Sequence, residues 1–165
     1  MQKIHPFLWF DTQAEEAMHF YCSVFKNSKP GKVVRNGDAG PGPKGSVLVC
    51  SFELEGEQFT ALNGGPHFKF NNAISLVVDC KSQEEVDTLW DKLTAGGGEP
   101  GDCGWLKDKY GLSWQITPDA LIELLQDADP ARSQRVMAAM MTMKKIDIAA
   151  LKRAHGGPVT AGAGS

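Results

Sequence analysis

The chain has few cysteines, and none of them is arranged as a metal site. Its four cysteines, Cys22, Cys50, Cys80 and Cys103, lie far apart, without a C-x-x-C pair or a histidine at metal-ligand spacing. Structural zinc sites depend on such closely spaced ligands. The spacing argues against structural zinc. Isolated cysteines of a cytosolic chain mostly pack as small buried hydrophobes, and Cys103 is the least certain case because it begins a hairpin.

Long apolar runs and an excess of one charge are also missing. No run approaches the roughly 20 apolar residues that span a bilayer, and residues 1–7 lack the apolar region of a secretion signal. The 17 basic and 20 acidic residues are interspersed and give a net charge of −3, which provides no basic field for a nucleic-acid backbone. We therefore expect a cytoplasmic, soluble protein with neither a membrane nor a nucleic acid as partner.

What is present is enough apolar sequence for a core. Of the 165 residues, 42% are hydrophobic and 22% charged, which suits one domain or two small halves that share a core. The clearest element is a β-hairpin over residues 103–117, because two runs rich in Trp, Leu, Tyr and Ile flank the turn sequence 108–111. Its second strand alternates Trp114 and Ile116 with Ser113, Gln115 and Thr117, so the Gln115 amide is expected to face the space that the sheet encloses.

The two halves of the chain repeat one order of elements. The first half predicts a strand over 4–10 with both faces covered, then a helix capped by Asp11 or Thr12 and ending near Phe25. A strand over 32–35, a Gly- and Pro-rich loop over 36–46 and a hairpin of 47–54 with 58–63 follow. The second half predicts a strand over 73–79, a helix over 83–93, a strand near 99–102 and the 103–117 hairpin. Each half thus forms a β-α-β-β-β module.

Helices are expected after the second module. Apolar spacing predicts helices over 118–125, 131–143 and 147–154, followed by a flexible tail over 156–165. An apolar stripe on the middle helix is expected to pack against the sheet or a second subunit: Val136, Met137, Met140, Met141 and Met143. We expect one domain over residues 1–155, with modules at about 3–66 and 72–117.

Several motifs carry a family resemblance over about residues 3 to 155. They are the duplicated module together with residues 7–11, 61–65, 68–70 and 103–115. With them the chain resembles the PhnB-like branch of the vicinal-oxygen-chelate superfamily, which contains glyoxalases, bleomycin-resistance proteins and dioxygenases. The resemblance implies an α+β fold with two βαβββ modules that form a half-open barrel, and a homodimer. The branch is commonly labelled demethylubiquinone methyltransferase-like, which implies a methyltransferase. The sequence has no Gly-rich loop of an S-adenosylmethionine site between its first strand and helix.

The resemblance also suggests where a metal would be held. Metal enzymes of the superfamily use His or Glu on the first and last strands of each module, and the repeat places His5, Ala61, Ala73 and Gln115 there. Two of these are alanines, whereas a catalytic metal usually has at least three protein ligands. We therefore expect neither a metal nor a cofactor.

The predicted site is an aromatic cavity that binds a small, partly apolar metabolite. Its candidate lining residues are His5, Phe7, Trp9, Asn63, Ser75, Trp105 and Gln115. His5 is a candidate for a general base, because imidazole titrates near neutral pH; its alternative is a structural hydrogen bond at the sheet end. Two functions remain open: a non-metal binding protein, or an enzyme that is a lyase, isomerase or dioxygenase, or the methyltransferase of the family label.

Overall fold

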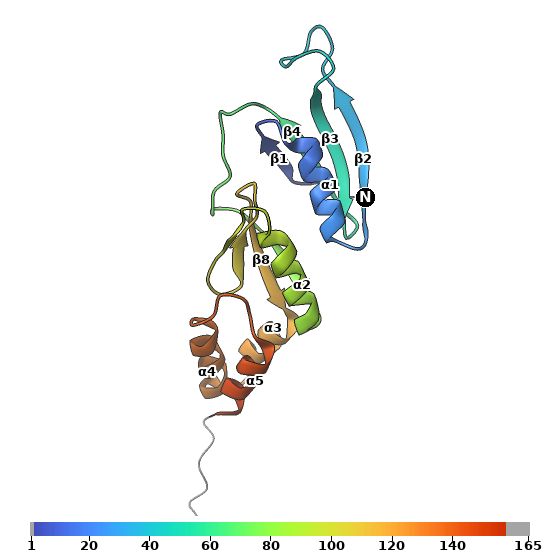
Figure 1. Ribbon diagram of the computed structural model, residues 1–165. Helices are drawn as coiled ribbons and strands as arrows, with labels where there is room; N and C mark the ends of the chain where they lie inside the picture. Colours follow the sequence, from blue (N-terminus) through green and yellow to red (C-terminus); the bar gives the residue numbers. More distant parts are fainter. Residues whose placement is uncertain (1, 158–165) are drawn as a thin grey trace, which may run out of the picture. The chain divides into compact units, whose positions relative to one another are not determined.

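The computed structural model describes residues 2–157, and the chain divides into two compact units, residues 1–70 and 71–165. Each unit holds one β-α-β-β-β module with a four-stranded sheet (Figure 1). The α+β class and the two predicted modules are therefore confirmed, and each sheet is open rather than closed into a barrel. The grouping of both modules into one domain over 1–155 remains a prediction.

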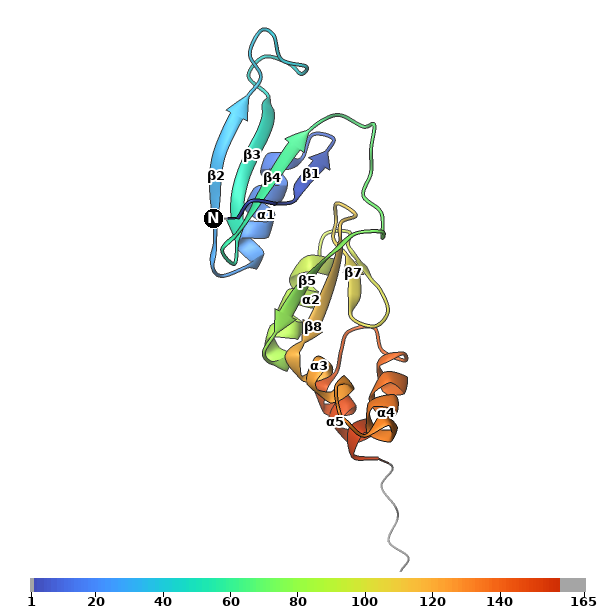
Figure 2. The same ribbon diagram turned by 180° about the vertical axis from the view of Figure 1, so that it is seen from behind.

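The first unit consists of β1 (Phe7–Phe10), α1 (Ala14–Val24), β2 (Ser28–Arg35), β3 (Val47–Leu54) and β4 (Glu57–Asn63). The strand order is β1-β4-β3-β2, with β1 parallel to β4 and the other pairs antiparallel. The helix α1 covers one face of this sheet (Figures 1 and 2). β2 begins at Ser28 rather than residue 32, because its first three residues also pair with β3 ahead of a register shift.

The two faces of the first sheet differ in burial. Leu8 and Phe10 are buried, whereas Phe7 is 57% exposed. Within this unit a helix covers one face only, so this unit alone does not provide the predicted cover on both faces of the first strand. The opposite face, which carries Phe7 and Trp9, is called the open face below.

The second unit repeats this plan with β5 (Ser75–Cys80), α2 (Gln83–Thr94), β6 (Glu99–Pro100), β7 (Trp105–Lys107) and β8 (Ser113–Pro118). Its strand order is β5-β8-β7-β6, with β5 parallel to β8. Trp114 and Ile116 are buried on one face of β8, and Ser113, on the Gln115 face, is buried as well. β5 starts at Ser75, so Ala73 lies before the strand in which it was expected.

Three helices complete the second unit: α3 (Asp119–Leu125), α4 (Pro130–Met140) and α5 (Ile148–Gly156). Their core consists of Leu121, Val136, Ile146 and Leu151, with Met140 and Met143 packed against it. α4 ends at Met140 instead of Met143. The chain that follows holds the hairpin entrance, because the carbonyl oxygens of Met143 and Lys144 accept hydrogen bonds of 2.8 and 2.7 Å from the amides of Cys103 and Gly104.

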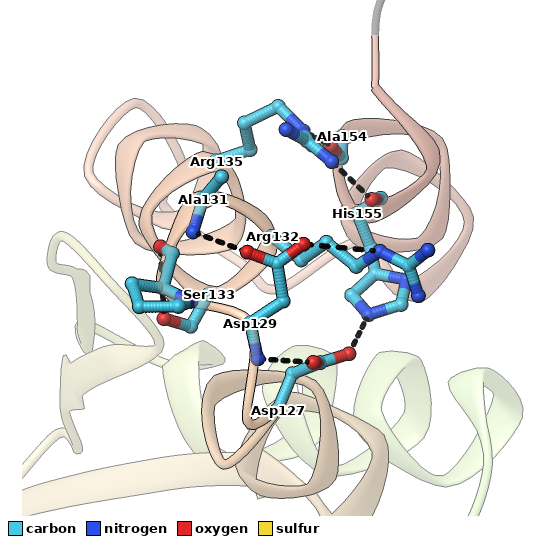
Figure 3. A network of polar contacts seen from close by, with 9 residues as sticks. Asp127, Asp129, Ala131, Arg132, Ser133, Arg135, Ala154 and His155 are labelled. Atoms are coloured by element: carbon cyan, nitrogen blue, oxygen red, sulfur yellow. Dashed lines mark hydrogen bonds and ion pairs between the residues drawn. The ribbon is translucent and has the colours of Figure 1, made fainter.

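A polar network joins the ends of these helices (Figure 3). The Asp127 carboxylate lies 2.7 Å from His155 Nε2 and accepts a 2.8 Å hydrogen bond from the Asp129 amide. Arg135 donates to the carbonyl oxygens of Ala154 and His155 at the end of α5. The amide of Asp129, followed by the His155 ring, lowers the pKa of Asp127. The network thus fixes the α3–α4 connection to the end of α5.

Two further predictions concern the C-terminal tail and membrane-spanning helices. Most of the tail expected over 156–165 lies outside the described residues, of which 157 is the last. Within residues 2–157, the helices are all too short or too polar to cross a membrane.

Candidate functional site

Trp9 is the centre of a set of contacts on the open face of the first sheet. Its indole Nε1–H donates a 3.0 Å hydrogen bond to the carbonyl oxygen of Gly65. The ring of Phe68 lies edge-on to the Trp9 ring, with centroids 4.9 Å apart and planes at 79°. Phe7 lies two residues before Trp9 on the same face. The structure therefore brings two of the predicted residues, Phe7 and Trp9, together, and adds Phe68, which the sequence did not single out for this place.

His5 does not form part of a catalytic arrangement within its unit. It precedes β1 and is exposed. Among residues 2–157 no hydrogen-bond partner of its ring is found, so neither a carboxylate that orients it nor a nucleophile that it activates is in place. The predicted hydrogen bond at the sheet end is also not formed.

Asn63 lies on the other side of the first sheet from Phe7 and Trp9. It shares the α1 face with Ala61, which is fully buried. Its Oδ1 accepts a 2.8 Å hydrogen bond from the Ala14 amide at the start of α1, and its Nδ2 donates to the Val47 carbonyl oxygen at 3.1 Å. Both amide atoms of Asn63 are therefore used within the fold. This placement corrects the expectation that Asn63 lines the cavity, and that Asp11 or Thr12 caps α1.

The face of the second sheet that α2 does not cover, called its open face, carries a polar pair of the predicted site. Gln115 Nε2 donates a 2.9 Å hydrogen bond to Ser75 Oγ. Trp105 lies directly across from Gln115 on β7, and Val77 lies across from it on β5 with 54% of its surface exposed. Within the described part of the chain, no further partner engages Gln115 Oε1, so this oxygen is available to a donor on a ligand. The structure thus groups Ser75, Trp105 and Gln115.

Asp108 is the residue that organises this hairpin, and the sequence analysis missed its role. It is 2% exposed. Its Oδ1 accepts from the amides of Tyr110 and Leu112, and its Oδ2 accepts from Trp114 Nε1 at 2.9 Å. An aspartate that begins a turn ahead of a glycine is typical of this type of side-chain-to-backbone turn, so the signal was present in the sequence.

The cysteines divide into buried and partly exposed residues. Cys50 and Cys80 are buried, and burial raises the pKa of the Cys50 thiol to about 11 and that of the Cys80 thiol to about 12. Thiols that are protonated at neutral pH are poor nucleophiles and metal ligands. These two cysteines therefore pack as small hydrophobes, as predicted. Cys103 is partly exposed, and its sulfur lies 3.9 Å from that of Met141.

A hollow of about 400 Å³ on the second unit lies away from Gln115, at the starts of α2 and α5. Several of its polar groups are used within the fold. Gln83 Oε1 accepts from the Ile148 amide at 2.8 Å, Asp147 caps α5, and Ser82 caps α2. We therefore regard this hollow as a joint between helices rather than as the ligand site.

The residues at the superfamily's metal positions do not fit a divalent ion. Ala61 and Ala73 supply no donor atom, and Ala61 also faces α1 instead of the open face. Over residues 2–157, no three His, Cys, Asp or Glu side chains are close enough together to hold a metal. The start of α1 is equally unsuited to the nucleotide loop of a common methyltransferase fold, because Asn63 takes the Ala14 amide.

Comparisons with known proteins agree with the duplicated module. The profile of the 3-demethylubiquinone-9 3-methyltransferase family matches residues 2–117. A PhnB protein from Bacillus cereus, described as a 3-demethylubiquinone-9 3-methyltransferase, is 40% identical over 71% of this chain and 99% of its own, with a TM-score of 0.65. A Pseudomonas aeruginosa protein is 18% identical over 72% of this chain and 98% of its own, with a TM-score of 0.56.

A glyoxalase/bleomycin resistance protein from Albidiferax ferrireducens is 18% identical over 67% of this chain and 92% of its own, with a TM-score of 0.43. No curated protein matches the chain. The family match ends at residue 117, so the helices α3 to α5 lie outside it. From the match over residues 2–117 and the 40% identity to the PhnB protein, the chain belongs to the PhnB-like 3-demethylubiquinone-9 3-methyltransferase family.

Proposed function

We propose that the protein binds a small, partly apolar metabolite, and that the open face of the second sheet, around Gln115, is where it binds. The observation that carries this proposal is the hydrogen bond of 2.9 Å between Gln115 Nε2 and Ser75 Oγ on a sheet face that is not covered by α2. Gln115 lies between Trp105 and the exposed Val77 on this face. The face therefore combines apolar surface with a fixed hydrogen-bonding group. Small-molecule sites commonly have this composition.

The polar pair is suited to orient a neutral group on the ligand. Gln115 is held by Ser75, so its Oε1 has a defined direction and accepts a hydrogen bond from the ligand. A hydrogen bond between neutral groups contributes about 0.5 to 1.5 kcal/mol net, and contact with Trp105 and Val77 adds the burial of apolar surface. An amide neither gives up nor takes a proton near neutral pH, so Gln115 acts in binding and not in acid–base chemistry.

A screen of small aromatic or quinone-like metabolites tests this function. We expect a compound that changes tryptophan fluorescence, and we expect Gln115→Ala to weaken its binding several-fold while the protein stays folded. Trp105→Phe should remove much of the optical signal, since Trp105 lies across from Gln115. The matched control is Gln134→Ala, which removes an exposed glutamine on α4 and should leave binding unchanged. Hits that bind Gln115→Ala as tightly as the parent would overturn the proposal.

The alternative is an enzyme of the same superfamily, a lyase, isomerase or dioxygenase, or the methyltransferase that the family name describes. The family match is the observation in its favour. Native mass spectrometry of protein purified without chelator discriminates the two functions. A bound metal ion or S-adenosylmethionine at about one per chain favours the enzyme, whereas the binding function predicts neither.

We also propose a cytoplasmic homodimer. Exposed apolar side chains on α4 and directly after it, Met137 at 38% and Met141 at 64%, supply surface for a second copy. Light scattering at micromolar concentration should give twice the chain mass. A monomer mass that does not depend on concentration would contradict this assembly.

A further inference from the structure

We infer that the ring position beside Trp9 is a subsite for a flat aromatic group, and that Phe68 fills it when no ligand is bound. The inference rests on the proposed small-molecule function. It adds a second surface for contact with a ligand, which lies on the first unit and which Phe68 occupies when no ligand is bound. Phe68 belongs to the connector of residues 64–70 that follows β4. Its ring centroid lies 4.9 Å from that of Trp9, at an interplanar angle of 79°. This is the edge-to-face arrangement that aromatic rings prefer.

The backbone of the connector is fixed at its start. The amides of Gly64 and Gly65 donate to the carbonyl oxygens of Phe10 and Asp11, at 2.9 and 3.3 Å. The Trp9 indole donates to the Gly65 carbonyl oxygen. A Cβ on Gly64 would lie 2.2 Å from the Trp9 ring, so only glycine allows this approach. The position of the Trp9 ring is therefore set by the connector backbone and does not depend on Phe68.

The Phe68 side chain is held much less firmly than this backbone. It is 66% exposed, so most of its ring remains in water. Phe70, at the other end of the connector, contacts the ring of Phe10, with centroids 5.3 Å apart, and anchors that end of the connector. A rotation of the Phe68 side chain uncovers the edge of Trp9 without any change at Gly64, Gly65 or Phe70. An aromatic ring from a ligand then gains the contact that Phe68 gives up.

The chemistry of the position selects flat rings. The indole Nε1–H is already bonded to Gly65, so it offers no donor to a ligand. What remains is the π surface, which favours the edge or face of another aromatic ring over a saturated one of equal size. Because Phe68 competes for the same place, its removal should tighten the binding of such a ring, since the bound state no longer has to displace it.

The test follows the Trp9 indole signal by NMR, assigned with Trp9→Phe, while 1-naphthol or its saturated counterpart decahydro-1-naphthol is added. We expect 1-naphthol to shift this signal, decahydro-1-naphthol to shift it little, and Phe68→Ala to tighten 1-naphthol at least threefold. Lys69→Ala, at an exposed neighbour on the same connector, should bind like the parent. Phe68→Leu, which keeps an apolar side chain without a ring, should behave like Phe68→Ala.

Each other outcome counts against the inference. A Trp9 signal that does not move, or equal or weaker binding by both Phe68 variants, would overturn it. The Gln115 side-chain amide signal, recorded in the same titration, separates this failure from that of the proposed function. If Gln115 responds and Trp9 does not, the subsite is wrong and the function stands. If neither signal responds to 1-naphthol or to any hit of the metabolite screen, both are wrong.

Discussion

The two units share one order of elements but start their helices differently. In the second unit Ser82 Oγ accepts from the Glu85 amide at 3.2 Å, and the Glu85 carboxylate accepts from the Lys81 amide at 2.8 Å. Both bonds lie within five residues. They differ from a capping box only in that Glu85 bonds the amide of Lys81, one residue before the Ser82 cap. In the first unit, Gln13 makes no side-chain cap, and Asn63 supplies the acceptor for Ala14 from 49 positions away. The start of α1 therefore depends on β4, whereas α2 carries its own start.

At the hairpin turns the two units exchange these roles: the first unit has the simple local turn, and the second unit depends on one side chain. In the first unit Glu55 and Gly56 turn the chain by backbone conformation alone, with φ of 50° and 82°. The turn between β7 and β8 of the second unit is instead built around the buried Asp108 carboxylate, which also binds the Trp114 indole from the next strand. Each unit thus has one connection that needs no special side chain from elsewhere and one that depends on a single side chain with several partners, Asn63 in the first unit and Asp108 in the second. Substitutions at the two kinds of connection should differ in cost.

The largest effect is expected at Asp108. Asp108→Ala leaves the Tyr110 and Leu112 amides and the Trp114 indole without their acceptor, and bonds to a charged group are worth about 1.5 to 3 kcal/mol each before relaxation. We expect the free energy of unfolding of the second unit to fall by about 3 kcal/mol or more, as measured by hydrogen exchange of the β8 amides. Gly56→Ala, at the local turn of the first unit, should cost only about 1 to 2 kcal/mol. Equal losses at the two turns would contradict this comparison.

A smaller effect is expected at the helix starts. Asn63→Ala removes a cap, worth about 0.5 to 2 kcal/mol, and also the bond to the Val47 carbonyl oxygen. We expect a loss of about 2 kcal/mol, with faster hydrogen exchange in α1 and along β3 and β4. Ser82→Ala removes only the local cap of α2 and should cost about 1 kcal/mol, confined to α2. If exchange in β3 stays unchanged in Asn63→Ala, the coupling between helix and sheet is wrong.

The smallest effect is a pH dependence of the C-terminal helices. The Asp129 amide and the His155 ring lower the pKa of Asp127, so its carboxylate stabilises the folded helices at pH values above its ordinary pKa of about 3.9. This contribution is lost as the pH falls through the lower folded-state value. We expect amide protection in α4 and α5 to decrease below about pH 4. Asp127→Asn should flatten that decrease, and an identical profile in the variant would rule out this origin.

The order of elements could be predicted because it depends on neighbouring residues. Alternation along residues 113–117 predicted that Trp114 and Ile116 share one face and Gln115 lies on the other, and the repeated order of strands and helix predicted both modules. Boundaries that depend on pairing were less accurate. β2 begins earlier because β3 offers it a partner. α4 ends earlier, and the carbonyl oxygens of Met143 and Lys144 beyond it bind the hairpin entrance. Such contacts join residues that are distant in sequence.

The sequence by itself determined the fold class, the family resemblance and which strand faces are apolar, since these follow from side-chain periodicity and local turns. Only the tertiary structure decided what each polar or aromatic candidate does. Asn63 caps α1 because β4 passes its first residue, and Gln115 is fixed because the parallel pairing of β5 and β8 sets Ser75 beside it. Trp9 is flanked by Phe68 because the connector folds back on β1. The role of a side chain depends on the atoms that other segments bring within about 3 to 5 Å of it, and periodicity does not encode that proximity.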